Sequence, residues 1–230
     1  MKYFIILLLA VAITGCASSK GFDRGSLRAQ IEDQQIAATA DDITAVAPKP
    51  LPTPFKLAIY FVQPKSDRRH ESSWTWKEEE KDLLLQIGDD LKGKRILSNI
   101  FVLDDSALEG DGNEAVREAA SRAGADAVLI VNGISSIDRY NNKYGITYLF
   151  LVTPFFVSGT EADCLVLINA SMWDVQSKYV HMLADAEGSA RQTRPAFLIS
   201  ETRIINDAKS SALTLLKNEL TTRLIGMNVK

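Results

Sequence analysis

Cysteine and histidine are scarce in this sequence, with two residues of each among 230. Two cysteines cannot build a scaffold of several disulfide bonds, and they are too few for a cysteine-rich zinc site. Two histidines restrict metal chemistry further. The sequence therefore predicts no metal site.

An excess of charge of either sign is also absent. The chain has 26 basic and 29 acidic residues, which gives a formal net charge of −3. A nucleic-acid-binding protein normally carries a basic stripe, so we expect no nucleic acid as partner. The hydrophobic and charged fractions, 46% and 24%, are typical of a globular protein. The length fits one domain with additional segments.

The motifs of common catalytic and cofactor sites are missing as well. There is no phosphate-binding Gly-Lys-Ser/Thr loop and no GxGxxG. His70-Glu71 begins a zinc-protease motif, but Trp74 stands where the second histidine belongs. The segment GISSI at 133–137 lacks the last glycine of a nucleophile elbow. We therefore expect no cofactor, no catalytic residue and no enzymatic activity, although one sequence leaves open a site assembled from distant positions.

The N-terminus has the features of a bacterial lipoprotein signal. Lys2 precedes an apolar core over residues 3–13, and ITGC at 13–16 resembles the lipobox. Residues 1–15 are thus predicted to be a signal peptide, and Cys16 to carry a covalent diacylglycerol. Ala17 replaces the aspartate of an inner-membrane retention signal, so we expect the periplasmic face of the outer membrane in a Gram-negative host. An ordinary secretory signal with an accidental cysteine is the alternative.

Residues 16–54 are predicted to be the lipidated cysteine and a flexible tether. The segment lacks sustained periodicity and ends in alternating prolines, which favour extended polyproline II structure. Such a tether would hold the domain away from the membrane and would be dispensable for folding. One alternative stays open, because Leu27, Ile31 and Gln35 have helical spacing and predict a short helix packed on the domain.

Residues 55–230 are predicted to form a single periplasmic α/β (α+β) domain. The expected order is βαβαβ, followed by a β-hairpin and a long C-terminal helix, which gives a mixed sheet flanked by helices. Alternating apolar residues predict the hairpin, with Val180, Met182 and Ala184 on one face of its second strand. The predicted strands are 55–62, 96–103, 127–131, 165–175 and 179–186, and the predicted helices are 77–92, 114–123 and 200–225, the last with Leu213, Leu216, Leu220 and Leu224 in the core.

Three segments carry a resemblance to known domains. They are LAI at 57–59, the junction GADAVL at 124–129 and INASMWDV at 168–175. In these segments the chain resembles the periplasmic α/β domain of curli-secretion-type lipoproteins and of lipoprotein activators of peptidoglycan synthases. The resemblance implies a binding domain and supplies no catalytic residues.

A narrower resemblance is to the rhombotarget lipoproteins, a bacterial family of unknown biochemical role. It is carried by RGSL at 24–27, by residues 144–159 and by DVQSK at 174–178. The chain lacks the Gly-Gly, hydrophobic and basic C-terminal tail associated with such families.

The most apolar segment of the domain is YGITYLFLVTPFFV at 144–157. The favoured interpretation is a buried strand with a bend at Pro154. A partner-binding surface is the second, with Tyr148, Phe150, Phe155 and Phe156 as the candidate contact residues. Insertion into a membrane is the third.

Two reactive side chains in the domain have ordinary structural interpretations. Cys164 lies in a strand-like run and is expected to be a small buried core residue. His181 is expected at the surface or at an edge.

The sequence thus predicts an outer-membrane-anchored, non-enzymatic binding or assembly module of the cell envelope. Its expected partners are the outer membrane, through the lipid on Cys16, and a periplasmic protein or a second copy of the chain. A subunit of an outer-membrane secretion or pore complex is the alternative.

Overall fold

The computed structural model describes residues 18–32, 50–63, 75–150 and 152–227, so the predicted signal peptide, Cys16 and His70 lie outside the described residues. In chain order the elements are α2 (Arg24–Glu32), β1 (Phe55–Phe61), α4 (Glu78–Leu85), α5 (Ile87–Gly93), β2 (Leu97–Leu103), η1 (Asp105–Ala107), α6 (Gly112–Arg122), β3 (Ala127–Asn141), η2 (Lys143–Leu149), η3 (Thr153–Phe155), β4 (Thr160–Asp174), β5 (Val180–Arg194), η4 (Ala196–Leu198) and α7 (Glu201–Met227).

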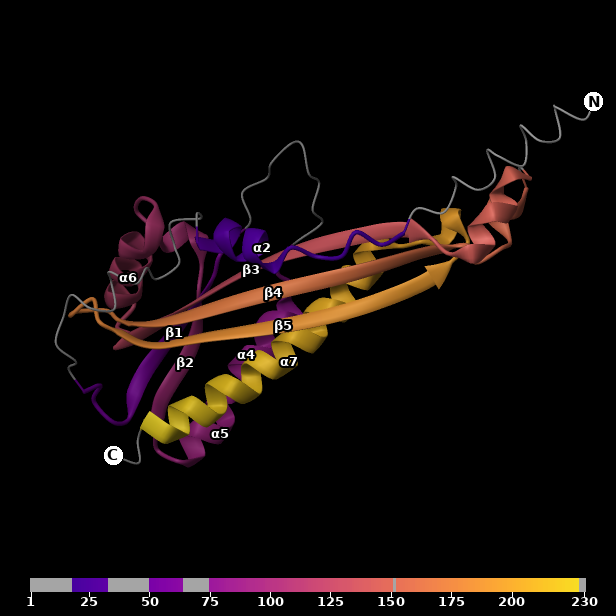
Figure 1. Ribbon diagram of the computed structural model, residues 1–230. Coiled ribbons are helices and arrows are strands. Elements are labelled where there is room, and N and C mark those ends of the chain that lie inside the picture. The colour runs from indigo at the N-terminus through magenta and orange to yellow at the C-terminus, as the bar shows by residue number, and fades with distance from the viewer. Residues whose placement is uncertain (1–17, 33–49, 64–74, 151, 228–230) are drawn as a thin grey trace, which may run out of the picture.

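The strands form one mixed sheet in the order β2-β1-β3-β4-β5 (Figure 1). β1 is parallel to both β2 and β3, whereas β3 with β4 and β4 with β5 are antiparallel. The predicted α+β fold, with its hairpin and its long C-terminal helix, is confirmed.

Three strands are longer than the sequence predicted, β3 and β5 by the most. β3, β4 and β5 have 15 residues each, against seven in β1 and in β2. β1 pairs with β3 only over Ala127–Val131. Beyond Val131, β3, β4 and β5 continue as a narrow ribbon that leads away from the rest of the sheet (Figure 1). We call the end of this ribbon, at Asn141, Thr160 and Arg194, the distal end.

Helices cover both faces of the sheet. α4, α5 and α7 pack on one face, and α6 and α2 pack on the other (Figure 1). The alternation along β4 supports this division, because Val166, Ile168, Ala170 and Met172 share the α7 face. Trp173 packs against the α6 cluster. β1, most of β4 and the first part of β3 are therefore buried on both faces, as the apolar run Ala127–Val131 predicts, whereas the edge strands β2 and β5 are partly exposed.

α7 lies along β4 and β5 on one face of the sheet. Its predicted core residues, Leu213, Leu216, Leu220 and Leu224, are all buried. Their three- and four-residue spacing places them on one side of the helix. The predicted docking of the C-terminal helix is confirmed.

The single helix predicted over 77–92 is instead two helices. α4 ends at Leu85 and α5 begins at Ile87, with Gln86 capping both helices. In α5, Gly88 approaches β2 so closely that an added Cβ would lie 2.3 Å from Cγ2 of Ile100. This close contact depends on how α5 packs on β2. The spacing of apolar residues within one segment cannot predict such packing.

α2 is the short helix that the sequence left open. Asp23 precedes it and accepts a hydrogen bond from the backbone N–H of Ser26 through Oδ1, at 3.0 Å. Leu27 and Ile31 are buried against Leu165 and Leu167 of β4. Arg24 adds a two-pronged ion pair with Glu187 of β5, with N–O distances of 2.9 and 2.6 Å. Residues 18–32 therefore lie on the domain.

This packing makes α2 part of the stability of the domain. We expect the double change Leu27→Ala and Ile31→Ala to lower the free energy of unfolding by about 3 kcal/mol, because each removes a buried apolar side chain. Urea unfolding of the chain without residues 1–16 measures the effect. The exposed pair Arg28→Ala and Gln30→Ala is the matched control and should change stability by less than about 0.5 kcal/mol. Equal stability of the two double variants would instead favour the dispensable tether.

Candidate functional site

Cys164 has no access to a substrate. Its side chain is fully buried in the core on the α7 face, and burial raises the pKa of the thiol to about 12. Because the thiolate is the reactive form, a thiol with so high a pKa is inert at neutral pH. The interpretation as a core residue is confirmed.

His181 is buried, contrary to the expectation of a surface or edge position. Its side chain is 6% exposed and meets the ring of Tyr179 edge-on. Met172 pairs with Met182, but Trp173 pairs with Val180, so His181 is an extra residue in β5. Such a bulge breaks the alternation of a strand. The predicted face was therefore wrong: Val180 joins the α6 cluster, while Met182 joins the core under α7.

Burial of His181 predicts that stability depends on pH. Desolvation lowers the pKa of its imidazole below 6.5, and Asp174, 3.7 Å away, opposes this only in part. As the pH falls, the imidazole therefore takes up its proton more readily in the unfolded chain than in the folded chain. Protonation then favours unfolding, so the free energy of unfolding contributed by His181 is greatest above pH 6.5 and falls below it. We expect the slope between pH 7 and 5 to approach at most about 1.4 kcal/mol per pH unit.

Urea unfolding at pH 7.5 and at pH 5.5 measures this loss, and His181→Gln should reduce it. The pKa of Asp174 is lowered by its backbone donors despite burial, so that carboxyl titrates below this range. An unchanged slope in the variant would assign the pH dependence to other groups.

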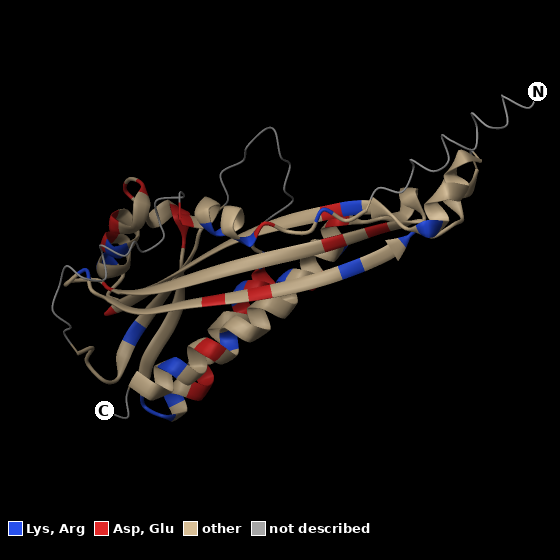
Figure 2. Cartoon of the chain, viewed as in Figure 1, with Lys and Arg blue, Asp and Glu red and all other residues tan. Residues whose placement is uncertain are grey.

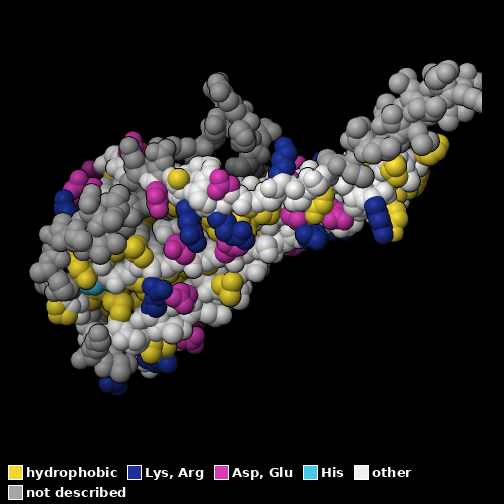
Figure 3. Space-filling view, viewed as in Figure 1, with side chains coloured by type: hydrophobic (Ala, Val, Ile, Leu, Met, Phe, Trp, Pro, Cys, Tyr) yellow, Lys and Arg dark blue, Asp and Glu magenta, His cyan; other side chains and the backbone are white. Residues whose placement is uncertain are grey.

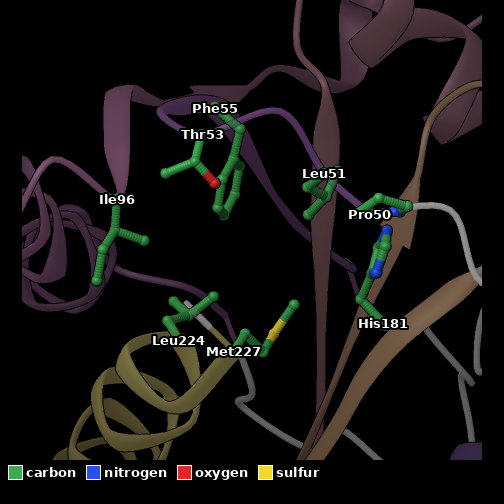
Figure 4. A pocket seen from close by; sticks show the side chains of 8 residues that line it. All are labelled: Pro50, Leu51, Thr53, Phe55, Ile96, His181, Leu224 and Met227. Carbon is green, nitrogen blue, oxygen red and sulfur yellow. The ribbon is translucent and has the colours of Figure 1, made fainter. Parts of the chain in front are cut away.

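A cavity of about 260 Å³ opens beside His181. It is lined by Pro50, Leu51, Thr53, Phe55, Ile96, His181, Leu224 and Met227 (Figure 4). The imidazole of His181 points toward Pro50, and it is the one titratable side chain among the lining residues. Among these described lining residues, no second titratable side chain lies beside the imidazole.

The acidic segment from Asp104 to Glu114 is engaged in local contacts. Asp104 accepts a hydrogen bond from the backbone of Ser106, and Glu109 and Glu114 pair with Arg122 and Lys178. Within the described ranges no group of three His, Cys, Asp or Glu side chains is placed to hold a metal ion. The segment is a solvated connection between β2 and α6.

The distal end of the ribbon carries a cluster of exposed apolar side chains. The segment predicted as a buried strand forms η2 and η3, and η4 follows β5 at the same end. We call these three turns and their connections the apolar tip. Its exposed residues are Tyr144, Ile146, Leu149, Phe150, Val152, Phe155, Phe156, Phe197 and Leu198. Figure 3 shows hydrophobic side chains gathered at this end of the molecule.

Two of the four candidate contact residues are the most exposed aromatic side chains of the tip. Phe156 is 82% exposed and Phe150 is 69% exposed. Phe155 stacks on Phe197 at a centroid distance of 4.4 Å. The contribution of Phe197 and Leu198 was missed, although the apolar run AFLI between β5 and α7 was a signal for it.

Tyr148, the fourth candidate, supports the tip from inside. Its hydroxyl donates to the carbonyl of Val157 at 3.0 Å and accepts from the N–H of Gly159 at 2.9 Å. Gly159 also fits directly against the backbone of Gly145, where a Cβ would lie 2.8 Å from the nitrogen of Gly145. These contacts tie the start of the tip to its end, so its apolar residues are displayed by a built structure.

Charged side chains of both signs lie at the base of the tip. Lys143 is the one charged residue between positions 142 and 158. Its ammonium lies over the ring of Tyr144, 5.2 Å from the centroid. Arg139, which donates to the carbonyl of Ala196, and Arg194, the last residue of β5, are exposed. Figure 2 shows basic and acidic residues along this end of the ribbon. Glu161, the second residue of β4, lies at the base of the tip and accepts hydrogen bonds from Tyr140 and from the side chain of Asn142. Asp163, two residues farther from the tip, pairs with Arg191 and also accepts from Tyr140.

No family model matches the chain, and no curated protein matches it in sequence. The folds of several solved structures are similar. A minor lipoprotein from Acinetobacter baumannii has 11% identity, coverage of 76% of this chain and 92% of that one, and a TM-score of 0.39. The C-terminal domain of LpoB from Salmonella enterica has 9% identity, coverage of 74% and 100%, and a TM-score of 0.30.

A PelC dodecamer from Paraburkholderia phytofirmans is also similar, with 14% identity, coverage of 74% of this chain and 91% of that one, and a TM-score of 0.30. Bacterial lipoproteins are thus among the similar structures, but a likeness this distant does not extend to function. In the described part of the chain, no helix has the length and apolar character needed to cross a membrane.

Proposed function

We propose that the protein is a lipid-anchored, non-enzymatic binding or assembly module on the periplasmic face of the outer membrane, and that it works by contact through its apolar tip. The observation that carries the proposal is the exposure of the tip, above all of Phe150 and Phe156. Monomeric soluble proteins rarely display a contiguous apolar surface without using it.

Two further features support a contact function. The tip is held in shape by the hydrogen bonds of Tyr148 and by the stacking of Phe155 on Phe197. A surface that is already ordered loses less conformational entropy on binding than a mobile loop would. The reactive groups of the domain, Cys164 and His181, are buried away from the tip. Anchoring rests on the lipobox at 13–16, with Cys16 as the lipidated residue.

Substitutions at the tip test the contact function separately from folding. We expect Phe150→Ser and Phe156→Ser each to change the free energy of unfolding by less than about 0.5 kcal/mol, because both side chains are already in solvent. Phe155→Ser should cost somewhat more, since it loses the stack on Phe197. If all three variants unfold, the segment is core and the proposal is wrong.

A photo-reactive amino acid at position 156 of the full chain then identifies what meets the tip in the cell. We expect adducts there and none at Gln176, which is exposed in the turn at the opposite end of the β4–β5 hairpin. Cys16→Ser should release the protein from the membrane fraction and reduce the adducts. Equal labelling at positions 156 and 176 would contradict a contact function of the tip.

A further inference from the structure

The first described residues of the chain are fastened near the distal end of the ribbon. One carboxylate oxygen of Asp138, on β3, accepts three hydrogen bonds from them. The donors are the hydroxyl of Ser19 and the backbone N–H groups of Lys20 and Gly21, at 2.7, 2.7 and 3.0 Å. In Figure 1 this segment, drawn in indigo, runs beside β3 from α2 and begins close to the tip.

This attachment restricts where a lipid on Cys16 can lie. Cys16 is three residues from Ser19, and a fully extended chain spans at most about 11 Å over that length. Asp138 is three residues from the end of β3, which adds about 10 Å along the strand. With the hydrogen-bonded side chain of Asp138 included, the lipid is therefore held within about 30 Å of the base of the tip. The opposite end of β4, at Asp174, lies about 45 Å from the base of the tip along the strand.

The membrane that holds the lipid must then lie at the tip end of the molecule. Residues 18–32 pack on the sheet through α2 and cannot act as a spacer between lipid and domain. The first described residues, which follow Cys16 in the chain, lie beside the end of the ribbon that carries the apolar tip (Figure 1). The attachment of residues 19–21 to Asp138 therefore holds the apolar tip close to the bilayer.

The chemistry of the tip fits the interface of a bilayer. Aromatic side chains favour the boundary between acyl chains and headgroups, and basic side chains next to them attract anionic headgroups. The tip has Tyr144, Phe150 and Phe156 exposed, with Lys143 and Arg194 at its border. No acidic residue occurs between positions 142 and 158, and the carboxylate of Glu161 at the base of the tip is hydrogen-bonded to Tyr140 and Asn142.

We infer that the apolar tip inserts into the headgroup and acyl-chain boundary of the leaflet that carries the Cys16 lipid, so that the domain stands on the membrane with its ribbon as the stalk. This inference rests on the lipid anchoring in the proposed function and names the occupant of its contact surface. The tip is a set of short turns and would lie in the interface without crossing the bilayer.

A fluorescent label at the tip tests the inference. Cys164 is buried, and Cys16 would be blocked by lipid, so Phe156→Cys introduces one reactive thiol. The full lipidated chain, labelled there with an environment-sensitive dye, is reconstituted into vesicles of phosphatidylethanolamine and phosphatidylglycerol. We expect the emission to rise several-fold, to shift to the blue and to be quenched by lipids with a nitroxide near the headgroup. The same dye at Gln176→Cys should remain aqueous and unquenched.

Three other results would overturn the inference and are distinguishable. If the protein binds the vesicles but the dye at position 156 stays in a water-like environment, the anchoring is supported and insertion of the tip is rejected. A chain that fails to float with the vesicles would reject the anchoring on which the inference rests. A label that is shielded without lipid quenching, and that transfers energy to a second dye on another copy, would assign the tip to self-association.

Discussion

Gly188→Ala is expected to destabilise the domain by about 3 kcal/mol or more, because α7 and β5 touch at this residue with no room for a side chain. An added Cβ would lie 2.1 Å from the carbonyl oxygen of Ala208 and 2.6 Å from the nitrogen of Ala212. Both atoms belong to the backbone of α7, so no side-chain rotation can relieve the overlap. The helix must move off the strand, and the core contacts along it loosen together.

Urea unfolding of the Gly188→Ala variant measures this loss. Gly226→Ala is the matched control, since it makes the same substitution within α7 where no atom lies within 4 Å of the added Cβ. Alanine is a better helix former than glycine, so the control should be neutral or slightly stabilising. A stable Gly188→Ala variant would show that α7 is not seated on β5 as described.

The second large effect is expected at Glu80, which neutralises a buried lysine. The ammonium of Lys209 on α7 is 2.8 Å from Oε2 of Glu80 on α4, and the lysine side chain is 1% exposed. Its Nζ also donates to the carbonyl of Thr75 at 2.6 Å. We expect Glu80→Ala to cost about 3–5 kcal/mol, because it removes the carboxylate that lies 2.8 Å from a buried ammonium group.

Two further variants separate charge burial from lost packing. Glu80→Gln with Lys209→Met removes both charges and keeps the side-chain lengths, so this pair should recover part of the loss. Glu78→Ala breaks the pair between Glu78 and Lys81, in which the glutamate is 80% exposed, and should cost less than about 1 kcal/mol. If Glu80→Ala and Glu78→Ala lose the same stability, the buried pair does not join α4 to α7.

Most of the architecture could be predicted from local patterns. The buried side of a strand or helix repeats with the period of that element, so the sequence alone shows it. Examples are the run Ala127–Val131, the alternation of Val166, Ile168 and Ala170, and the leucine spacing in α7. The bulge at His181 could not be predicted, because it depends on how β4 and β5 are paired. The break at Gln86 depends in the same way on how α5 meets β2.

The sequence by itself determined the order of the elements and the buried faces of β4 and α7, and it carries the lipobox at Cys16. Only the tertiary structure decided that apolar side chains such as Leu149, Phe150 and Phe156 are exposed. An apolar run favours burial, but it is buried only if other elements of the folded domain pack over it. Here β3, β4 and β5 extend past the shorter strands, and α2 packs no farther along the ribbon than Ile134, Leu165 and Leu167. The apolar connections at the distal end therefore project beyond the layers that bury the rest of the sheet.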